Sequence, residues 1–442
     1  MTALIVYIRI GFLLALQIAA VTLAIAIVAF AIAQSWLVHR YCWCLNQSRQ
    51  MSEGSEGSER ESDDEAPFLP AAAVVVCLRG DDPSLYECLL GLAQQEYPEF
   101  QLYGVVDNEN DPAIETFESA RTAFDCQPIL VTIPEIAKHR SLKCSALLAA
   151  FEVIKQNQFD PEVVALLDSD VNCDPYWLAD LVAPFQNSEV GATTGNRWFE
   201  PESNEIGTWM RQIWNAAAVV QMYHYNIAWG GSLAFRATLI DQEKFLAPLR
   251  IGFCEDTRMN RVLAKFDLEL VRVPGLIMSS TESTTPGKCF SFIARQLLTT
   301  KLYHRAWPLV AFHGLLIPFF IFAAIVIPFC ASDSQVTLFH LLPLFALVLL
   351  QALNLFLLER IARANHLCLS ERDQPIGKSV SLVHYLLAVI LIQFVHAFAV
   401  LAAIFKRVYS WRQIDYHIKG NDVSMLQYQP FVSPVSDDGS IE

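Results

Sequence analysis

Two aspartates follow an apolar segment in the first half of the chain, in a position that could support metal chemistry. They belong to the triplet Asp168-Ser169-Asp170, which comes directly after residues 163–167. If this apolar segment is a buried strand, both carboxylates emerge at the edge of a sheet, where Mg²⁺ or Mn²⁺ can bind carboxylates together with substrate phosphates. Such an ion would neutralise the charge that builds on a diphosphate leaving group. The alternative is a structural role in capping the next helix.

A second acidic pair, Glu255-Asp256, stands before the helical pattern of residues 257–266. Asp256 could act as a general base that removes a proton from an attacking hydroxyl, or it could only complement the dipole of this helix. The glycine pair Gly230-Gly231 lies between the two acidic sites and precedes an apolar strand pattern. Adjacent glycines suit a backbone that passes close to a sugar.

These residues need a scaffold that brings them together, and alternating strand and helix patterns predict one. Short apolar runs end in Gly, Pro or Asp, and helical patterns lie between them. The alternation indicates an α/β fold with a doubly wound, Rossmann-like sheet, in which ligands bind beyond the carboxyl ends of the strands. The acidic residues should therefore face one crevice. The expected strands are residues 71–78, 101–106, 128–132 and 162–167, and the expected helices are residues 85–95 and 142–156.

Four apolar runs without Asp, Glu, Lys or Arg contribute much of the hydrophobic fraction of 53%. A bilayer core needs a helix of about 20 apolar residues, so each run is long enough to span. The first run is too long for a typical cleaved signal peptide and is expected to remain as an anchor. The second and third could instead pack as a tight hairpin across residues 331–335. The runs are residues 11–38, 308–330, 336–358 and 379–405.

Basic residues predict the side of the membrane on which the α/β domain lies. His39, Arg40 and Arg49 follow the first run, so the positive-inside tendency places the domain in the cytosol. The membrane would be a bacterial inner membrane, or the Golgi or endoplasmic reticulum in a eukaryote. The loop 359–378 is also basic and agrees with this placement. The same one-plus-three scheme puts four basic residues on the opposite side, against the tendency: Lys406, Arg407, Arg412 and Lys419.

Charge and composition describe the remaining segments. The net charge of −15 argues against nucleic acid as a partner. An acidic stretch with few apolar side chains separates the first run from the domain and cannot fold alone. The 11 cysteines contain no Cys-x-x-Cys pair and are expected to be free thiols. The expected organisation is an N-terminal anchor (1–50), an acidic disordered linker (51–69), a cytosolic α/β domain (70–283), an interfacial segment (284–307), three membrane helices (308–405) and a C-terminal tail (406–442).

Six motifs occur in order between Ala72 and Pro308. They are Arg79-Gly80-Asp81-Asp82-Pro83, Gln94-Gln95-Glu96-Tyr97-Pro98, Asp107 to Ile114, Asp168-Ser169-Asp170, Gly230-Gly231-Ser232-Leu233-Ala234-Phe235-Arg236 and Glu255-Asp256. In their order and in their placement on the expected elements they resemble the inverting glycosyltransferases of the family-2 type, which have the GT-A fold. The resemblance is greatest to the ceramide glucosyltransferases, and the layout of the apolar runs extends it.

This resemblance implies a role for each candidate. Either Asp107 or Asn108, with Lys143, would contact the uridine and diphosphate of a UDP-sugar. Asp168 and Asp170 would bind a divalent cation, Mg²⁺ or Mn²⁺, together with the diphosphate. Asp256 would be the base in a single displacement that inverts the anomeric carbon. The expected substrate-binding residues are Asp107, Asn108, Lys143, Asp168, Gly230, Gly231, Glu255 and Arg295.

One motif departs from the family pattern. Members of this group usually carry Gln or Arg, two further residues and then Arg-Trp just before the membrane helices. Here Arg295 matches the start, but Leu298 and Thr299 stand where Arg-Trp is expected. Arg295 or Lys301 could replace the missing charge. Otherwise the departure implies weakened donor binding or an inactive protein.

The leading interpretation is transfer of one sugar from a UDP-sugar to the hydroxyl of a membrane lipid such as ceramide. The segment 284–307 would then be an interfacial element that brings the lipid headgroup to Asp256. One alternative is a processive polysaccharide synthase of the hyaluronan or cellulose kind, which typically has more spans and an intact Arg-Trp motif. A second is a non-catalytic membrane protein that retains a nucleotide-sugar fold.

A transporter is a weaker alternative, because the apolar runs contain no acidic or basic side chain of the kind that marks ion paths. Four histidines do lie in these runs, and each is expected to form hydrogen bonds between helices and not to belong to a proton relay. They are His313, His340, His384 and His396.

Overall fold

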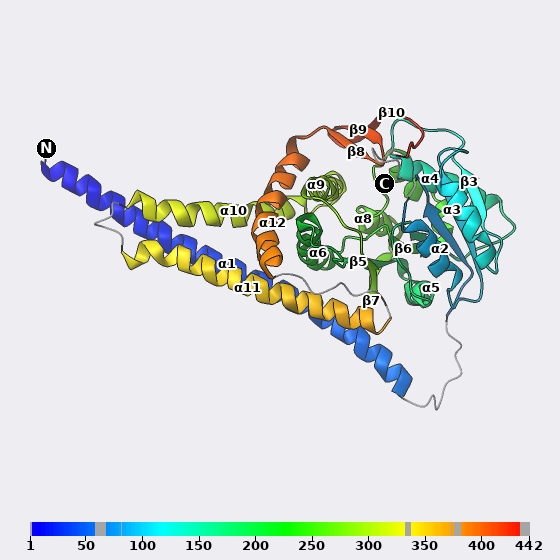
Figure 1. The fold of residues 1–442 in the computed structure, drawn as a ribbon, viewed down its shortest axis with the longest axis horizontal. Coiled ribbons are helices and arrows are strands. Elements are labelled where there is room, and N and C mark those ends of the chain that lie inside the picture. Colours follow the sequence, from blue (N-terminus) through cyan, green and yellow to red (C-terminus); the bar gives the residue numbers. More distant parts are fainter. Residues whose placement is uncertain are drawn as a thin grey trace.

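The computed structural model describes residues 2–57, 68–80, 82–331, 337–372, 374 and 382–433. An α/β domain lies at one end of the molecule, and long helices extend away from it (Figure 1). The seven-stranded sheet of the domain has the order β3-β2-β1-β4-β6-β5-β7. Its strands are β1 (Ala72–Cys77), β2 (Phe100–Val106), β3 (Ile129–Thr132), β4 (Val163–Leu167), β5 (Val190–Phe199), β6 (Ser232–Arg236) and β7 (Glu269–Ser280).

The first four strands run parallel, and β6 is antiparallel to both β4 and β5. The apolar run of β1 is buried along almost its whole length because helices cover both faces of the sheet. One face packs on α2 (Leu85–Ala93), α3 (Ala113–Ala120) and α5 (Trp177–Val182). The other packs on α4 (Leu142–Gln156), α7 (Glu243–Arg250) and α8 (Met259–Leu263). The doubly wound α/β fold is therefore confirmed.

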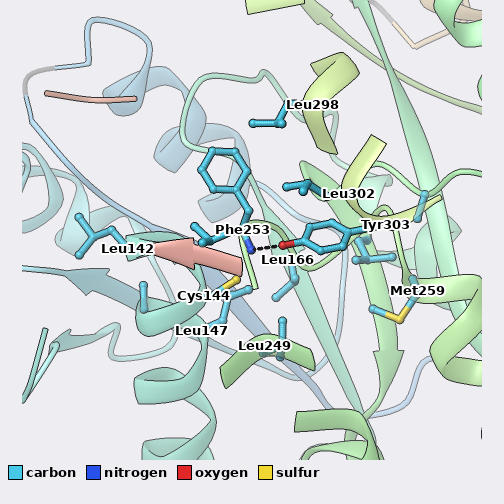
Figure 2. Close-up of a cluster of buried hydrophobic side chains, with 14 of the residues drawn as sticks. Leu142, Cys144, Leu147, Leu166, Leu249, Phe253, Met259, Leu298, Leu302 and Tyr303 are labelled. Atoms are coloured by element: carbon cyan, nitrogen blue, oxygen red, sulfur yellow. Dashed lines mark hydrogen bonds between the residues drawn. The ribbon is translucent and has the colours of Figure 1, made fainter. Parts of the chain in front are cut away.

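Two further helices join this domain to the apolar part of the molecule. They are α6 (Ile206–Tyr225) and α9 (Pro286–Tyr303), and they pack on each other. The segment expected to be interfacial is thus mostly the helix α9. Its C-terminal half enters the domain core, where the backbone N–H of Phe253 donates to the hydroxyl oxygen of Tyr303 at 2.8 Å. Figure 2 shows Leu298, Leu302 and Tyr303 of α9 beside Phe253 in this cluster.

Four helices are long and apolar enough to cross a membrane. They are α1 (Thr2–Gly57), α10 (Trp307–Cys330), α11 (Leu338–Ser370) and α12 (Leu382–Phe405). Helices α1, α10 and α11 pack together in an elongated bundle (Figure 1). Leu23 and Ile27 of α1 contact Phe320 and Leu350 in this bundle. The free apolar surface of the bundle is suited to lipid.

Helix α1 extends on both sides of the expected span and continues to Gly57. The first residues of the expected linker are therefore helical, and residues 58–67 lie outside the described part of the chain. The second half of α11 packs on the domain as well, since Leu357 and Ile361 join Tyr41 of α1 in a cluster with Trp198.

Helix α12 differs from the other three in direction and in neighbours. It packs on α6, α9 and α10, and in Figure 1 it runs across the direction of α10 and α11. The chain contacts the α/β domain on both sides of this helix. Before it, Gln374 accepts a hydrogen bond from Ser279 of β7 at 3.0 Å. At its end, the carbonyl oxygen of Ala403 accepts from Nζ of Lys301 at 2.8 Å.

The C-terminal residues form a second sheet that lies against the domain. Its strands are β8 (Val408–Trp411), β9 (Ile414–Lys419) and β10 (Asp422–Gln427), all antiparallel. The backbone N–H of Met425 donates to the carbonyl of Lys138 at 2.7 Å. The hydroxyl oxygen of Tyr416 accepts from the N–H of Leu142 at 3.1 Å. The described residues after α12 therefore lie beside the domain, whereas the one-plus-three scheme places their basic side chains on the opposite side of the membrane.

Candidate functional site

One cavity of about 1180 Å³ connects the strand ends of the domain to the apolar helices. At one end it is lined by charged residues from the ends of β1, β2 and β4 and from the loop before α8. At the other end it is lined by apolar residues from α1, α6, α10, α11 and α12. The expected site residues Asp107, Lys143, Asp168, Asp170, Gly230, Gly231, Glu255, Asp256 and Arg295 all line this cavity.

Lys143 connects the two acidic groups that the sequence predicted. Its Nζ lies 2.8 Å from Oδ1 of Asp168 and 2.7 Å from Oε1 of Glu255. Lys143 stands in the first turn of α4, which begins at the N-cap Ser141. Burial alone would lower the pKa of Lys143, but the two carboxylates outweigh it and hold the pKa well above its usual value. The ammonium therefore stays charged and positions both acids.

Glu255 is the most deeply buried of these acids. Its side chain is only 3% exposed, and burial raises its pKa to about 7 even though Lys143 lowers it. The nearby charge of Asp256 adds to the rise. With a pKa of about 7, Glu255 can exchange a proton near neutral pH.

Asp256 is held by hydrogen bonds that orient its carboxylate. Oδ2 accepts from the backbone N–H of Gly230 at 2.9 Å, and Oδ1 accepts from the hydroxyl of Thr257 at 2.9 Å. A Cβ added to Gly230 would stand 2.0 Å from Oε1 of Glu255, and one added to Gly231 would stand 2.5 Å from Oδ2 of Asp168. Both glycines thus allow the backbone to pass directly beside the acids.

Asp170 forms an ion pair with a different cation, Arg197. Oδ2 of Asp170 is 3.0 Å from Nη2 of Arg197, which projects from β5. Burial would raise the pKa of Asp170, but the guanidinium lowers it below the usual range. The carboxylates of Asp168 and Asp170 remain 27% and 21% exposed to the cavity. Two such carboxylates fit a Mg²⁺ or Mn²⁺ ion that completes its shell with substrate phosphates and water.

The helix that follows the first acidic group, α5, has Tyr176 as its N-cap and no side-chain cap hydrogen bond. Oδ1 of Asp174 accepts from the N–H of Tyr176, just before α5. No group of three or more His, Cys, Asp or Glu side chains that could hold a metal without substrate occurs in the described part of the chain.

All 11 cysteines are free thiols, as expected.

Asp107 and Asn108 take different positions after β2. Asp107 is buried in the cavity wall and forms an ion pair with Arg79 at the end of β1. Burial raises the pKa of Asp107, while Arg79 acts against this rise. The side chain of Asn108 accepts from the N–H of Asn110 in the turn and is absent from the described lining of the cavity. Of these two residues, Asp107 is therefore the one that lines the cavity.

Arg295 reaches the cavity from α9. Its guanidinium lies 5.7 Å from the ring of Phe292 and 5.9 Å from the ring of Trp411. The pKa of Arg295 is lowered to about 10, mainly by burial and next by the charge of Arg412. Among the described residues Arg295 forms no ion pair. Its charge is available to an anion in the cavity.

Leu298 and Thr299 have unlike environments on the same helix. Leu298 is fully buried in the core cluster of Figure 2, whereas Thr299 lines the cavity. Lys301 turns away to the end of α12. Of the two possible replacements for the missing arginine, only Arg295 therefore points to the site.

Several residues that line the cavity were not predicted as site residues from the sequence. Arg79 stood in a motif, but its partner was not predicted, since only the sheet order places β1 beside β2. Arg197, Trp411 and Arg412 come from segments in which no motif was recognised. The adjacent Trp411-Arg412, in a basic stretch of the C-terminal segment, was the one available signal.

The apolar end of the cavity contains a few polar side chains. His313 is within hydrogen-bond distance of Gln34 at 3.4 Å and Gln221 at 3.2 Å, and Nδ1 of His396 accepts from Trp214 at 3.0 Å. These two histidines bridge helices as expected. His340 instead contacts Thr337 beside its own helix, and Nδ1 of His384 has no hydrogen bond among the described residues.

A Rossmann-like sheet with acidic strand ends is joined in this chain to four helices that are long and apolar enough to cross a membrane. The family model for glycosyl transferase family 21 matches residues 15–423, and the chain belongs to this family. No curated protein matches the chain.

The solved structures that match the chain include two glycosyltransferases. The mannosyltransferase PcManGT from Pyrobaculum calidifontis, in complex with GDP-Man and Mn²⁺, is 16% identical, with 87% of this chain and 99% of that chain covered and a TM-score of 0.43. Glucosyl-3-phosphoglycerate synthase from Mycobacterium tuberculosis, in complex with Mn²⁺, UDP and its product, is 13% identical, with 52% and 79% covered and a TM-score of 0.32.

Restoring the family's arginine at position 298 should damage the protein. Leu298→Arg places a charge in the core cluster and should destabilise the fold by about 3 kcal/mol or more, seen as a lower melting temperature in detergent. Thr299→Trp, at the neighbouring cavity position, is the matched control and should melt near the wild type. An unchanged melting temperature together with higher activity for Leu298→Arg would contradict this expectation. It would show that the chain has lost a functional arginine at position 298.

Proposed function

We propose that this glycosyltransferase moves a single sugar from a UDP-sugar to a hydroxyl of a ceramide-like membrane lipid at the cytosolic face, with inversion at the anomeric carbon. The observation that carries the proposal is the continuity of the cavity. A nucleotide-sugar needs the charged end, and a lipid acceptor needs the apolar end. Both substrates can meet beside Asp256 without either leaving its preferred environment.

The apolar end is suited to an acyl chain because it opens between helices that also face lipid. Leu37 and Val38 of α1, Ile317 of α10 and Leu358 of α11 line it. Burying a hydrocarbon chain there is favourable by about 0.8 kcal/mol per methylene. The headgroup would then lie where α6 and α9 meet the domain, beside the charged residues.

Asp256 is the proposed general base. Its two oxygens are oriented by Gly230 and Thr257, so that the carboxylate can take a proton from the acceptor hydroxyl. The hydroxyl oxygen forms a bond to the anomeric carbon as the bond from that carbon to the diphosphate oxygen breaks. The electron pair leaves with UDP, and the proton remains on Asp256. The elevated pKa of Glu255 offers a nearby group that can take part in proton balance.

The diphosphate would bind between acidic and basic residues. Asp168 and Asp170 would hold Mg²⁺ or Mn²⁺, and this ion would neutralise negative charge on the leaving diphosphate. Asp107 and Lys143 are the proposed contacts to the uridine and the phosphates. Arg295 contributes a buried positive charge that a phosphate oxygen can accept from.

Removal of the divalent cation should stop transfer. Dialysis of the purified protein against a chelator is expected to reduce sugar transfer by about a hundredfold or more, since the ion supplies several kcal/mol of charge stabilisation. Added Mg²⁺ or Mn²⁺ should restore the rate, measured with radiolabelled UDP-glucose. Full activity after chelation would overturn the assignment of Asp168 and Asp170 as metal ligands.

Blocking the apolar end should separate lipid transfer from nucleotide binding. Ala217 of α6 is exposed and lines the cavity, so Ala217→Trp would fill space proposed for the lipid. Transfer to ceramide should fall by about tenfold or more, while UDP affinity stays within about twofold, because a ligand loses affinity when its pocket is filled.

The matched control is Ala123→Trp, at an exposed position on the surface of the domain. It should retain the wild-type rate with ceramide and with diacylglycerol. Unchanged lipid transfer by Ala217→Trp would contradict the proposed lipid path.

We further propose that α1, α10 and α11 cross the membrane, and that α12 lies near its cytosolic surface. The chain contacts the domain before α12 through Gln374 and after it through the sheet β8–β10. A helix that begins and ends near the same domain does not need to cross. With three crossings, Arg407 and Lys419 lie on the side of the domain, in agreement with the positive-inside tendency.

This arrangement predicts the exposure of three epitope tags in sealed vesicles. A tag after residue 433 and a tag in the loop around Ala123 should be cleaved by protease from the same side. A tag at the N-terminus should be protected under those conditions and serves as the control. Protection of the C-terminal tag with cleavage of the domain tag would restore the four-crossing scheme.

A further inference from the structure

The turn between β8 and β9 has an unusual composition for its geometry. Trp411 pairs with Ile414, so the turn consists of Arg412 and Gln413. Both have left-handed backbones, with φ of 46° and 62°. Two-residue hairpin turns with positive φ at both positions favour Asn and Gly, because a Cβ is costly there. Side chains kept at such positions against local preference often serve a function.

The turn is fixed in place by residues from both ends of the chain. Nε of Arg79 donates to the carbonyl of Arg412 at 2.9 Å, and Nη2 of Arg79 donates to the carbonyl of Gln429 at 2.9 Å. The amide of Gln413 exchanges hydrogen bonds with the backbone of Val432, at 2.7 Å and 3.2 Å. The turn therefore sits on the ends of β1 and β2, where parallel α/β sheets bind ligands.

Both turn residues, Arg412 and Gln413, line the cavity. Trp411, which precedes the turn, and Phe431 from the following segment also line it. Nη2 of Arg412 lies 2.6 Å from Oδ2 of Asp82, and this guanidinium is still 32% exposed. A guanidinium carries five N–H donors, so one carboxylate does not satisfy it.

Five arginines line the cavity, and two of them, Arg79 and Arg211, are paired with Asp107 and Glu282. Arg197 is paired with Asp170, and Arg412 with Asp82, but Arg295 has no ion pair in the described part of the chain. Arg412 and Arg197 repel Arg295 strongly enough to contribute to its lowered pKa. Like charges brought together in a buried cavity favour a multiply charged anion. A diphosphate, with several oxygens in a fixed spacing, suits such a cluster better than a single carboxylate.

We propose that Trp411 and the turn residue Arg412 are part of the donor site. Arg412 would bind the diphosphate beside Arg295, and Trp411 would form the adjoining wall. This inference rests on the proposed nucleotide-sugar donor. The C-terminal sheet is then a component of the binding site, although this sheet follows the last apolar helix in the sequence. Arg412 is thus a binding residue, whereas Arg79 and Gln413 act by positioning the turn.

The test compares Arg412→Gly with Asp82→Asn in the full-length purified protein. Glycine suits the left-handed turn, so Arg412→Gly should keep the fold while removing the guanidinium. Its UDP affinity should fall by about tenfold or more, the loss expected for a charge-assisted hydrogen bond. Asp82→Asn removes the intramolecular partner, keeps the acceptor used by Ser84, and should change UDP affinity by less than about threefold.

UDP binding is measured by calorimetry, and the melting temperature of each variant is measured alongside. Equal affinity of Arg412→Gly and wild type would overturn the proposal. An equal loss in both variants would also overturn it, since the Arg412–Asp82 pair would then be only structural. If the wild type binds UDP but forms no glycolipid, the proposed acceptor fails while the comparison of affinities still decides the role of Arg412.

Discussion

The contact of Lys143 with Asp168 and Glu255 is the interaction on which the site depends. It joins the first turn of α4, the end of β4 and the loop before α8, three elements that are distant in sequence. Two buried carboxylates without a cation would be costly, and one of them would become neutral. The ammonium keeps them close enough for the glycine pair to pass beside both. The position of Asp256 follows, because its carboxylate is oriented by the backbone of Gly230.

A second constraint arises from the two proposed substrates. A charged donor requires polar walls, and a lipid acceptor requires apolar walls, yet the reacting atoms must meet. The cavity has both kinds of wall, because its lining changes from strand ends to helices. Helix α12 closes this cavity from the side and returns the chain to the domain. The resemblance expects an arginine and a tryptophan at positions 298 and 299. In this chain Arg412 and Trp411, near the C-terminus, line the cavity instead.

Much of the fold could be predicted from the sequence, because β1, β2 and β4 are apolar runs that end in polar residues, and buried parallel strands have this pattern. The acids at positions 168 and 170 were placed at a strand end on the same basis, whereas Asp256 was singled out by its position before a helical pattern and by the family resemblance. The pairing of Arg79 with Asp107 and of Arg197 with Asp170 could not be predicted, since each depends on strand order. The direction of α12 could not be predicted either, because hydropathy reports the length and polarity of a helix but not its orientation. The choice between Asp107 and Asn108 required the course of the turn after β2.

The central claim is that Asp256 serves as the base in sugar transfer to a lipid. The most direct measurement follows label from UDP-glucose into the organic phase, with ceramide as acceptor, for wild type, Asp256→Asn and the exposed control Asp160→Asn. We expect a singly glycosylated lipid from wild type and control, and a loss of about 10²–10⁴-fold for Asp256→Asn with UDP affinity largely kept. Polymer as the product, no labelled lipid from the wild type, or an unchanged rate for Asp256→Asn would contradict the account.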